Sequence, residues 1–167
     1  MKWWHIVLYA LGFGVTIVAE VASWSIPSLA FTVLPSVVYC GVLANSVSWP
    51  KSAVLAVLLG GLIDVFAPAP FGTWMIALVL LVIVTEWVTT TWLKQASVLS
   101  VFVAVTLGMV AAAVPFWLWA VISWQTPAVS SVIQLVSWWH WPVGWLIMSV
   151  IVALITRIIP SPYDRLI

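Results

Sequence analysis

Three acidic residues lie inside long apolar stretches of the chain: Glu20, Asp64 and Glu86. An ionisable side chain in a membrane-length apolar run needs a partner, and it is a functional-site hypothesis by default. Asp64 is the leading candidate because residues 60–72, Gly-Gly-Leu-Ile-Asp-Val-Phe-Ala-Pro-Ala-Pro-Phe-Gly, place it at the end of one apolar run and before a proline-rich break. A helix cap or a contact with interfacial water is the alternative, and residue chemistry alone leaves both open.

Other reactive side chains do not form a recognisable catalytic or metal-binding pattern. His5 and His140 are each flanked by tryptophan, which is typical of a membrane interface, and the single cysteine, Cys40, excludes an intramolecular disulfide. No His or acid pair has the spacing of metal ligands on one helix. Asp64 and Glu86 are expected toward opposite faces of the bilayer, so they do not make an acid dyad. The sequence therefore predicts no enzyme activity, no metal site and no cofactor.

The elements that must position these acids are membrane helices. Of the 167 residues, 65% are hydrophobic and only 5% are charged, against about 25% charged in ordinary soluble domains. The net charge of +1 is too small for a nucleic-acid footprint. The apolar runs predict an all-α, polytopic bundle forming one integral membrane domain over residues 1–167. Its six spans are predicted at about 4–22, 28–47, 52–66, 73–92, 97–122 and 141–159.

Basic residues and tryptophans predict how these spans are oriented. With a cytoplasmic amino terminus, all five cations fall on the cytoplasmic side: Lys2, Lys51, Lys94, Arg157 and Arg165. The opposite loops, about residues 23–27, 67–72 and 123–140, contain no Lys or Arg. Both termini are therefore expected in the cytoplasm, and Asp64 toward the outer face. The 14 tryptophans are interpreted as aromatic belts, with a sugar or lipid site in the outer group as the alternative.

Small and polar residues recur every four positions and predict the faces where helices pack closely. The four stripes are Gly12, Thr16 and Glu20; Ser36, Cys40 and Ala44; Ser52, Ala56, Gly60 and Asp64; and Ala104, Gly108 and Ala112. Glu20 is expected near the outer interface, either snorkelling there or serving a function. Glu86 shares its surroundings with Thr85, Thr89 and Thr90, a polar patch for which helix-to-helix hydrogen bonding is the favoured role. Kinks are expected at Pro35 and Pro115, and a short interfacial helix at about 128–136.

The central stretch resembles the rod shape-determining protein family MreD. Gly61-Leu62-Ile63-Asp64 and Pro70-Phe71-Gly72 match the motif of that family, with Phe71 in place of the usual Leu and Pro68 where glycine is common. The likeness extends over the second to fifth predicted spans. It implies a motif built from Gly61, Leu62, Asp64, Pro70, Phe71 and Gly72, with Glu20 and Glu86 as secondary polar residues inside the membrane.

The resemblance implies a non-catalytic component of the bacterial cell-elongation machinery in the cytoplasmic membrane, scaffolding or regulating peptidoglycan synthesis with MreC. Through MreC, the implied partners are MreB, RodA and a class B penicillin-binding protein, together with membrane lipids. That family is similar in fold to the substrate-binding subunits of energy-coupling-factor vitamin transporters, so a transporter subunit is the alternative function. For the scaffold, we predict that Asp64 accepts hydrogen bonds from backbone N–H groups of the turn that follows it.

Overall fold

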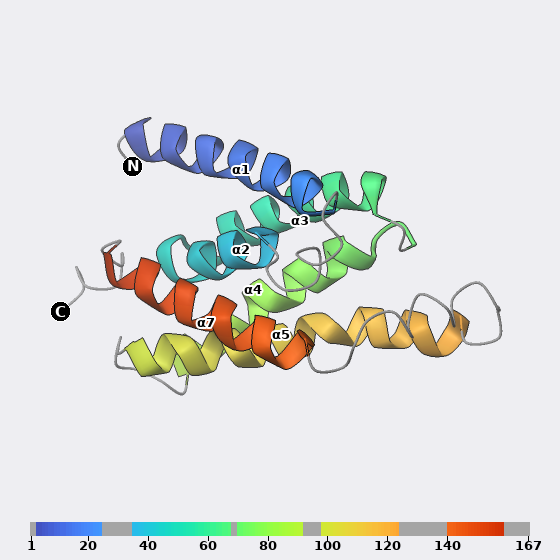
Figure 1. The fold of residues 1–167 in the computed structure, drawn as a ribbon. Coiled ribbons are helices and arrows are strands. Elements are labelled where there is room, and N and C mark those ends of the chain that lie inside the picture. Colours follow the sequence, from blue (N-terminus) through green and yellow to red (C-terminus); the bar gives the residue numbers. More distant parts are fainter. Residues whose placement is uncertain (1–2, 25–34, 68–69, 92–97, 124–139, 159–167) are drawn as a thin grey trace.

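The chain folds as a bundle of α-helices. The computed structural model describes residues 3–24, 35–67, 70–91, 98–123 and 140–158, and all regular secondary structure in these ranges is helical, as predicted. The helices are α1 (Trp3–Trp24), α2 (Pro35–Ser46), α3 (Trp49–Phe66), α4 (Thr73–Thr91), α5 (Val98–Ser123) and α7 (His140–Ile158) (Figure 1). Three of them are long and apolar enough to cross a membrane: α3, α4, and α5 over Val98–Trp119. These three helices indicate a membrane protein.

The start of α3 differs from the prediction. We expected the helix to begin at Ser52 after a polar connector, but it begins at Trp49 with Pro50 in its first turn. The N–H groups of Lys51 and Ser52 donate to the carbonyl oxygen of Ser48 at 3.0 and 3.2 Å. Proline is favoured in the first turn of a helix. An N–H group at that position would have no acceptor within the helix, so its absence costs no hydrogen bond.

Several other expectations fall partly or wholly beyond the described ranges. The described part of α2 begins at Pro35, so residues 28–34 of the predicted span lie outside it, and with them the segment before Pro35 on which the expected kink depends. The interfacial helix expected at about 128–136 and the tryptophans at 124, 138 and 139 also lie outside. α5 contains Pro115 in its interior and remains one helix from Val98 to Ser123.

The short helix α2 occupies the centre of the bundle and contacts each of the other five described helices. Around it, α1 packs on α3, α3 on α4, α4 on α5 and α5 on α7 (Figure 1). Because α2 is surrounded in this way, it has no single apolar face. Its small residues Ser36, Cys40 and Ala44 are all buried, as the four-residue spacing predicts.

Except for the half-buried Gly12, the other three stripes of small and polar residues are also buried between helices, which confirms the packing prediction. The buried members with side chains are Thr16, Glu20, Ser52, Ala56, Asp64, Ala104 and Ala112. At the α4–α5 crossing, a Cβ on Gly108 would meet the Thr85 hydroxyl and would lie 2.9 Å from the Leu81 carbonyl oxygen. The two backbones therefore approach as closely as only glycine allows.

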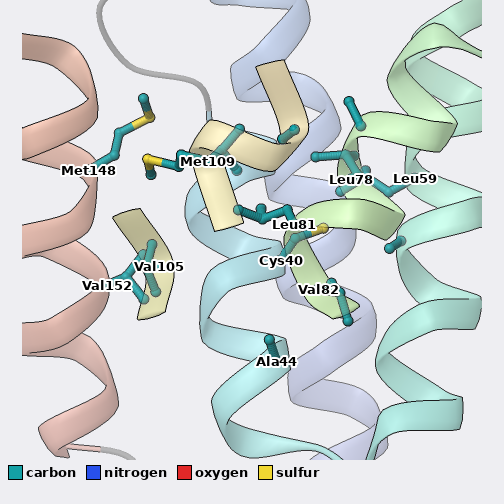
Figure 2. Close-up of a cluster of buried hydrophobic side chains, with 14 of the residues drawn as sticks. Cys40, Ala44, Leu59, Leu78, Leu81, Val82, Val105, Met109, Met148 and Val152 are labelled. Atoms are coloured by element: carbon teal, nitrogen blue, oxygen red, sulfur yellow. The ribbon is translucent and has the colours of Figure 1, made fainter. Parts of the chain in front are cut away.

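A hydrophobic core joins α2, α3, α4, α5 and α7 (Figure 2). Leu78 and Leu81 of α4 are fully buried, and Met109 of α5 faces Met148 of α7 in the close-up. Between α5 and α7, the Thr106 hydroxyl donates to the Ser149 hydroxyl at 3.1 Å. This core holds the helices that carry the candidate site in a fixed arrangement.

Candidate functional site

The Asp64 carboxylate lies in the last turn of α3 and binds the start of α4. Its Oδ2 atom accepts hydrogen bonds from the N–H groups of Gly72 at 2.9 Å and Met75 at 3.1 Å, and its Oδ1 atom accepts one from Trp74 at 2.9 Å. The side chain is only 5% exposed. The predicted hydrogen bonding between Asp64 and the following turn is confirmed, and it extends into the first turn of α4.

This carboxylate completes the hydrogen bonding at the amino terminus of α4. The first four N–H groups of a helix have no partner within the helix. Here three of the four donate to Asp64, and the remaining one, of Thr73, donates to the Pro70 carbonyl oxygen at 3.1 Å. The regular pattern then begins with the N–H of Ile76 donating to the Gly72 carbonyl oxygen at 2.9 Å. A residue of α3 thus caps α4, so the structure bears out the helix-cap alternative for Asp64.

Gly72 explains why the cap comes from another helix. Its φ of 97° is in the left-handed region that favours glycine, and glycine has no side chain with which to cap its own helix. The carboxylate of Asp64 fills that position instead. Its negative charge also lies beside the positive end of the α4 dipole, and the attraction between them stabilises the helix end and the carboxylate. Asp64 and Gly72 are therefore complementary parts of one structural unit.

Gly60 allows the two helices to come this close. A Cβ at Gly60 would lie 2.5 Å from the Met75 Cα atom, 2.7 Å from the Met75 nitrogen and 2.9 Å from the Trp74 carbonyl oxygen. A Cβ at Gly61 would meet only the terminal methyl group of Met75, at 3.6 Å. The resemblance points to Gly61, whereas the close approach occurs at Gly60. The signal in the sequence is the stripe that places Gly60 one helical turn before Asp64 on the same face.

The remaining motif residues do not contact the carboxylate through their side chains. Leu62, Pro70 and Phe71 are exposed, and Phe71, at 72%, is more exposed than Leu62, at 43%. Pro70 contributes its carbonyl oxygen, which accepts hydrogen bonds from the N–H and the hydroxyl of Thr73, the latter at 2.7 Å. The motif therefore combines a hydrogen-bonded interior, formed by Asp64 and Gly72, with an apolar exterior.

Glu20 makes a related contact between α1 and α2. It is only 1% exposed, and its Oε2 atom accepts a hydrogen bond from the N–H of Ser36 at 3.0 Å, next to the described start of α2 at Pro35. The snorkelling interpretation was wrong, because the four-residue stripe turns Glu20 into the bundle rather than along its surface. An acid near the end of one helix thus binds the start of the next in both α1–α2 and α3–α4.

Removing the Glu20 carboxylate is expected to weaken the attachment of α2. We expect Glu20→Ala to lower the free energy of unfolding by about 1–3 kcal/mol, because the buried N–H of Ser36 loses its acceptor. Thermal unfolding in detergent, followed by circular dichroism, measures the change. Thr16→Val is the matched control on the same stripe, since the Thr16 hydroxyl donates to the Gly12 carbonyl oxygen of its own helix. Equal losses in the two variants would contradict the role assigned to Glu20.

Glu86 lies in the last two turns of α4 and is buried, so it is not brought to Asp64 at the opposite end of the α3–α4 pair. The neighbouring threonines bond to the helix backbone. Thr90 donates to the Glu86 carbonyl oxygen at 2.8 Å, and Thr89 donates to the carbonyl oxygens of Thr85 and Glu86, each at 2.9 Å. The predicted polar patch is present, but the hydroxyls of Thr89 and Thr90 satisfy carbonyl groups near the end of α4.

The arrangement around Asp64 suits a rigid clamp. Both carboxylate oxygens accept backbone hydrogen bonds, so the side chain is held in one orientation. Within the described ranges, no three His, Cys, Asp or Glu side chains gather closely enough to hold a metal ion. Cys40 is fully buried on α2 and is a packing residue, as expected. The chemistry of the site is thus the fixing of one helix end against another.

Comparison with known proteins adds no assignment to this geometry. No family model, curated protein or solved structure matches the chain.

Proposed function

We propose that this chain is a non-catalytic component of the bacterial cell-elongation machinery that scaffolds or regulates peptidoglycan synthesis together with MreC. The observation that carries the proposal is the unit formed by Gly61-Leu62-Ile63-Asp64 and Pro70-Phe71-Gly72. Residues that resemble the MreD motif are joined by hydrogen bonds from Gly72, Trp74 and Met75 to Asp64. A motif whose one carboxylate is taken up by backbone N–H groups, and does not line an open site, fits a scaffold better than a catalyst.

The geometry also suggests how such a scaffold would work. A partner binds more tightly to a surface that is already held in its bound shape, because less conformational freedom is lost on association. The clamp fixes the ends of α3 and α4, and it leaves Leu62 and Phe71 exposed on that fixed frame. In the proposed complex this frame contributes to the position of MreC and, through it, of MreB, RodA and a class B penicillin-binding protein.

The proposal includes a topology of six spans in the bacterial cytoplasmic membrane with both termini in the cytoplasm. It is supported by the six described helices and by the distribution of the five cations in the sequence. In this topology α1 and α7 cross the membrane together with α3, α4 and α5, and the span that contains α2 includes residues before Pro35. The fold would then be similar to that of the vitamin-binding subunits of energy-coupling-factor transporters.

The experiment must also distinguish the scaffold from the alternative function, a substrate-binding transporter subunit. A small-molecule site combines apolar walls with a few polar groups that orient the ligand. Among the described residues, an open groove of about 390 Å³ lies on α5, and its lining side chains are all apolar: Val110, Ala113, Val114, Trp117, Leu118 and Val121. This groove does not favour vitamin binding.

The proposal is tested by purifying the tagged protein from its native membrane in mild detergent and identifying co-purified proteins by mass spectrometry. We expect MreC and wall-synthesis enzymes with the wild-type protein, and at least about ten-fold less MreC with Asp64→Asn, since loss of even 1.4 kcal/mol of binding free energy has that effect. Thr90→Val is the control and should retain MreC, because Thr90 is exposed near the other end of α4 and its hydroxyl donates to carbonyl oxygens of its own helix. Recovery of a transmembrane coupling subunit with ATPases would overturn the proposal in favour of the transporter.

A further inference from the structure

Helix α3 is close to the shortest that can cross a membrane. At 1.5 Å per residue, its 18 residues extend about 27 Å, whereas the hydrocarbon layer is about 30 Å thick. The 26 residues of α5 extend about 39 Å by the same measure. A tilt of about 20°, the average for such helices, would shorten the reach of α3 further.

Lys51 fixes one end of α3 at the membrane surface. Its side chain is exposed near the start of α3, and an ammonium group is held at the interface because its burial in hydrocarbon is costly. Phe66 follows Lys51 by 15 residues, which is about 22 Å along the helix axis. The end of α3 is therefore still within the hydrocarbon layer when Lys51 is at the opposite boundary.

The surface around the turn is suited to lipid. Val65, Phe66 and Phe71 are 65%, 60% and 72% exposed, and the first two continue the exposed apolar face of α3 that includes Val54 and Leu58. Phenylalanine does not share the preference of tryptophan and tyrosine for the headgroup region. The one charged group of the turn, Asp64, is turned inward and bound to α4.

Five of the seven residues from Ala67 to Thr73 either carry no backbone N–H or donate it within the protein, which suits an environment without water. Non-helical backbone is tolerated at membrane depth only where its polar groups are satisfied by protein or by water in a cavity. The N–H groups of Ala67, Gly72 and Thr73 have backbone or carboxylate acceptors, and Pro68 and Pro70 carry no N–H. In water these N–H donors could bond to solvent. The Asp64 carboxylate therefore stabilises the turn most where solvent is excluded.

From these observations we propose that the α3–α4 turn lies within the apolar layer of the bilayer, with Phe66 and Phe71 in contact with lipid acyl chains. The membrane is then locally thinned beside this hairpin, since lipid adjusts to a hydrophobic segment shorter than its own thickness. This inference rests on lengths, exposure and hydrogen bonding, and it is independent of the proposed function.

The test places single cysteines on the protein in lipid vesicles and measures their access to water and to lipid. Phe71→Cys and Phe66→Cys probe the turn, Lys51→Cys is the water-exposed control and Val54→Cys is the lipid-exposed control on the same helix. The native Cys40 is buried, and the wild-type protein measures its background reaction. All four probed side chains are exposed, so these substitutions remove no core contact.

We expect a charged, water-soluble thiol reagent to label both turn variants at least about ten-fold more slowly than Lys51→Cys, and at a rate close to that of Val54→Cys, because the reactive thiolate is disfavoured in hydrocarbon. Nitroxides attached at the turn should collide more often with oxygen, which concentrates in lipid, than with a water-soluble nickel chelate. Labelling as fast as Lys51→Cys would overturn the proposal. Shielding from both oxygen and nickel would also overturn it, because protein would then cover the turn.

Discussion

Replacing Asp64 with Asn is expected to lower the free energy of unfolding by about 2 kcal/mol or more, since the substitution removes a charge-assisted acceptor from buried donors. The amide nitrogen of Asn must occupy one of the two oxygen positions and cannot accept a hydrogen bond there. At least one N–H among Gly72, Trp74 and Met75 then loses its partner. The favourable contact between the carboxylate and the α4 dipole is lost as well. Thermal unfolding in detergent, followed by tryptophan fluorescence, measures the loss.

Two further variants separate capping from a general effect of substitution in a membrane helix. Asp64→Ala removes all three acceptor contacts, so its loss should exceed that of Asp64→Asn. Thr90→Val is the control, because Thr90 is exposed and its hydroxyl donates to carbonyl oxygens of its own helix. An Asp64→Asn protein that unfolds at the wild-type temperature would show that the carboxylate is not required to hold α4.

Much of this packing was predictable because close helix contacts leave a regular trace in the sequence. Small residues four positions apart share one helical face, and in a membrane that face is where backbones meet. The stripe that ends in Asp64 is buried along its length, from Ser52 through Ala56. The same stripe predicted that the carboxylate points into the bundle, and the short spacing from Asp64 to Gly72 brought the turn within its reach.

The hydrogen-bond partners of other polar side chains depended on which helix lies opposite them. The spacing of residues in the sequence does not contain that information. The stripe on α1 could not show that Glu20 meets the N–H of Ser36, because that contact joins two helices across residues 25–34. The threonines near Glu86 were expected to form a patch with it, but the sequence does not distinguish a hydroxyl that bonds to a side chain from one that bonds to the preceding turn. Pro50 was ambiguous for a similar reason, since proline is common on both sides of a helix start.

The two adjacent glycines at the end of α3 are equivalent in sequence but have different surroundings. Gly60 faces the backbone of α4, where no flexible side chain is present to move aside for an added carbon. Gly61 is turned by about 100° around the helix axis and faces the flexible end of Met75. Any residue with a Cβ at position 60 must push α4 away from α3, and this displacement would also lengthen the hydrogen bonds from Trp74 and Met75 to Asp64.

Gly60→Ala and Gly61→Ala should therefore have effects of opposite sign. At position 60 we expect a loss of about 1–3 kcal/mol or more, because a rigid backbone contact at 2.5 Å must be relieved. At position 61, alanine meets an ordinary contact at 3.6 Å and gains up to about 1 kcal/mol from its higher helix propensity.

Unfolding of both variants in the same detergent gives the comparison, and adding Asp64→Asn to each tests whether the effects are coupled. If the clamp depends on the close approach, Asp64→Asn should cost less in the Gly60→Ala background than in the Gly61→Ala background, because the displaced carboxylate already holds α4 less well. Equal costs in the two backgrounds would mean that the capping hydrogen bonds survive without the close contact, and the clamp would then depend on Asp64 alone.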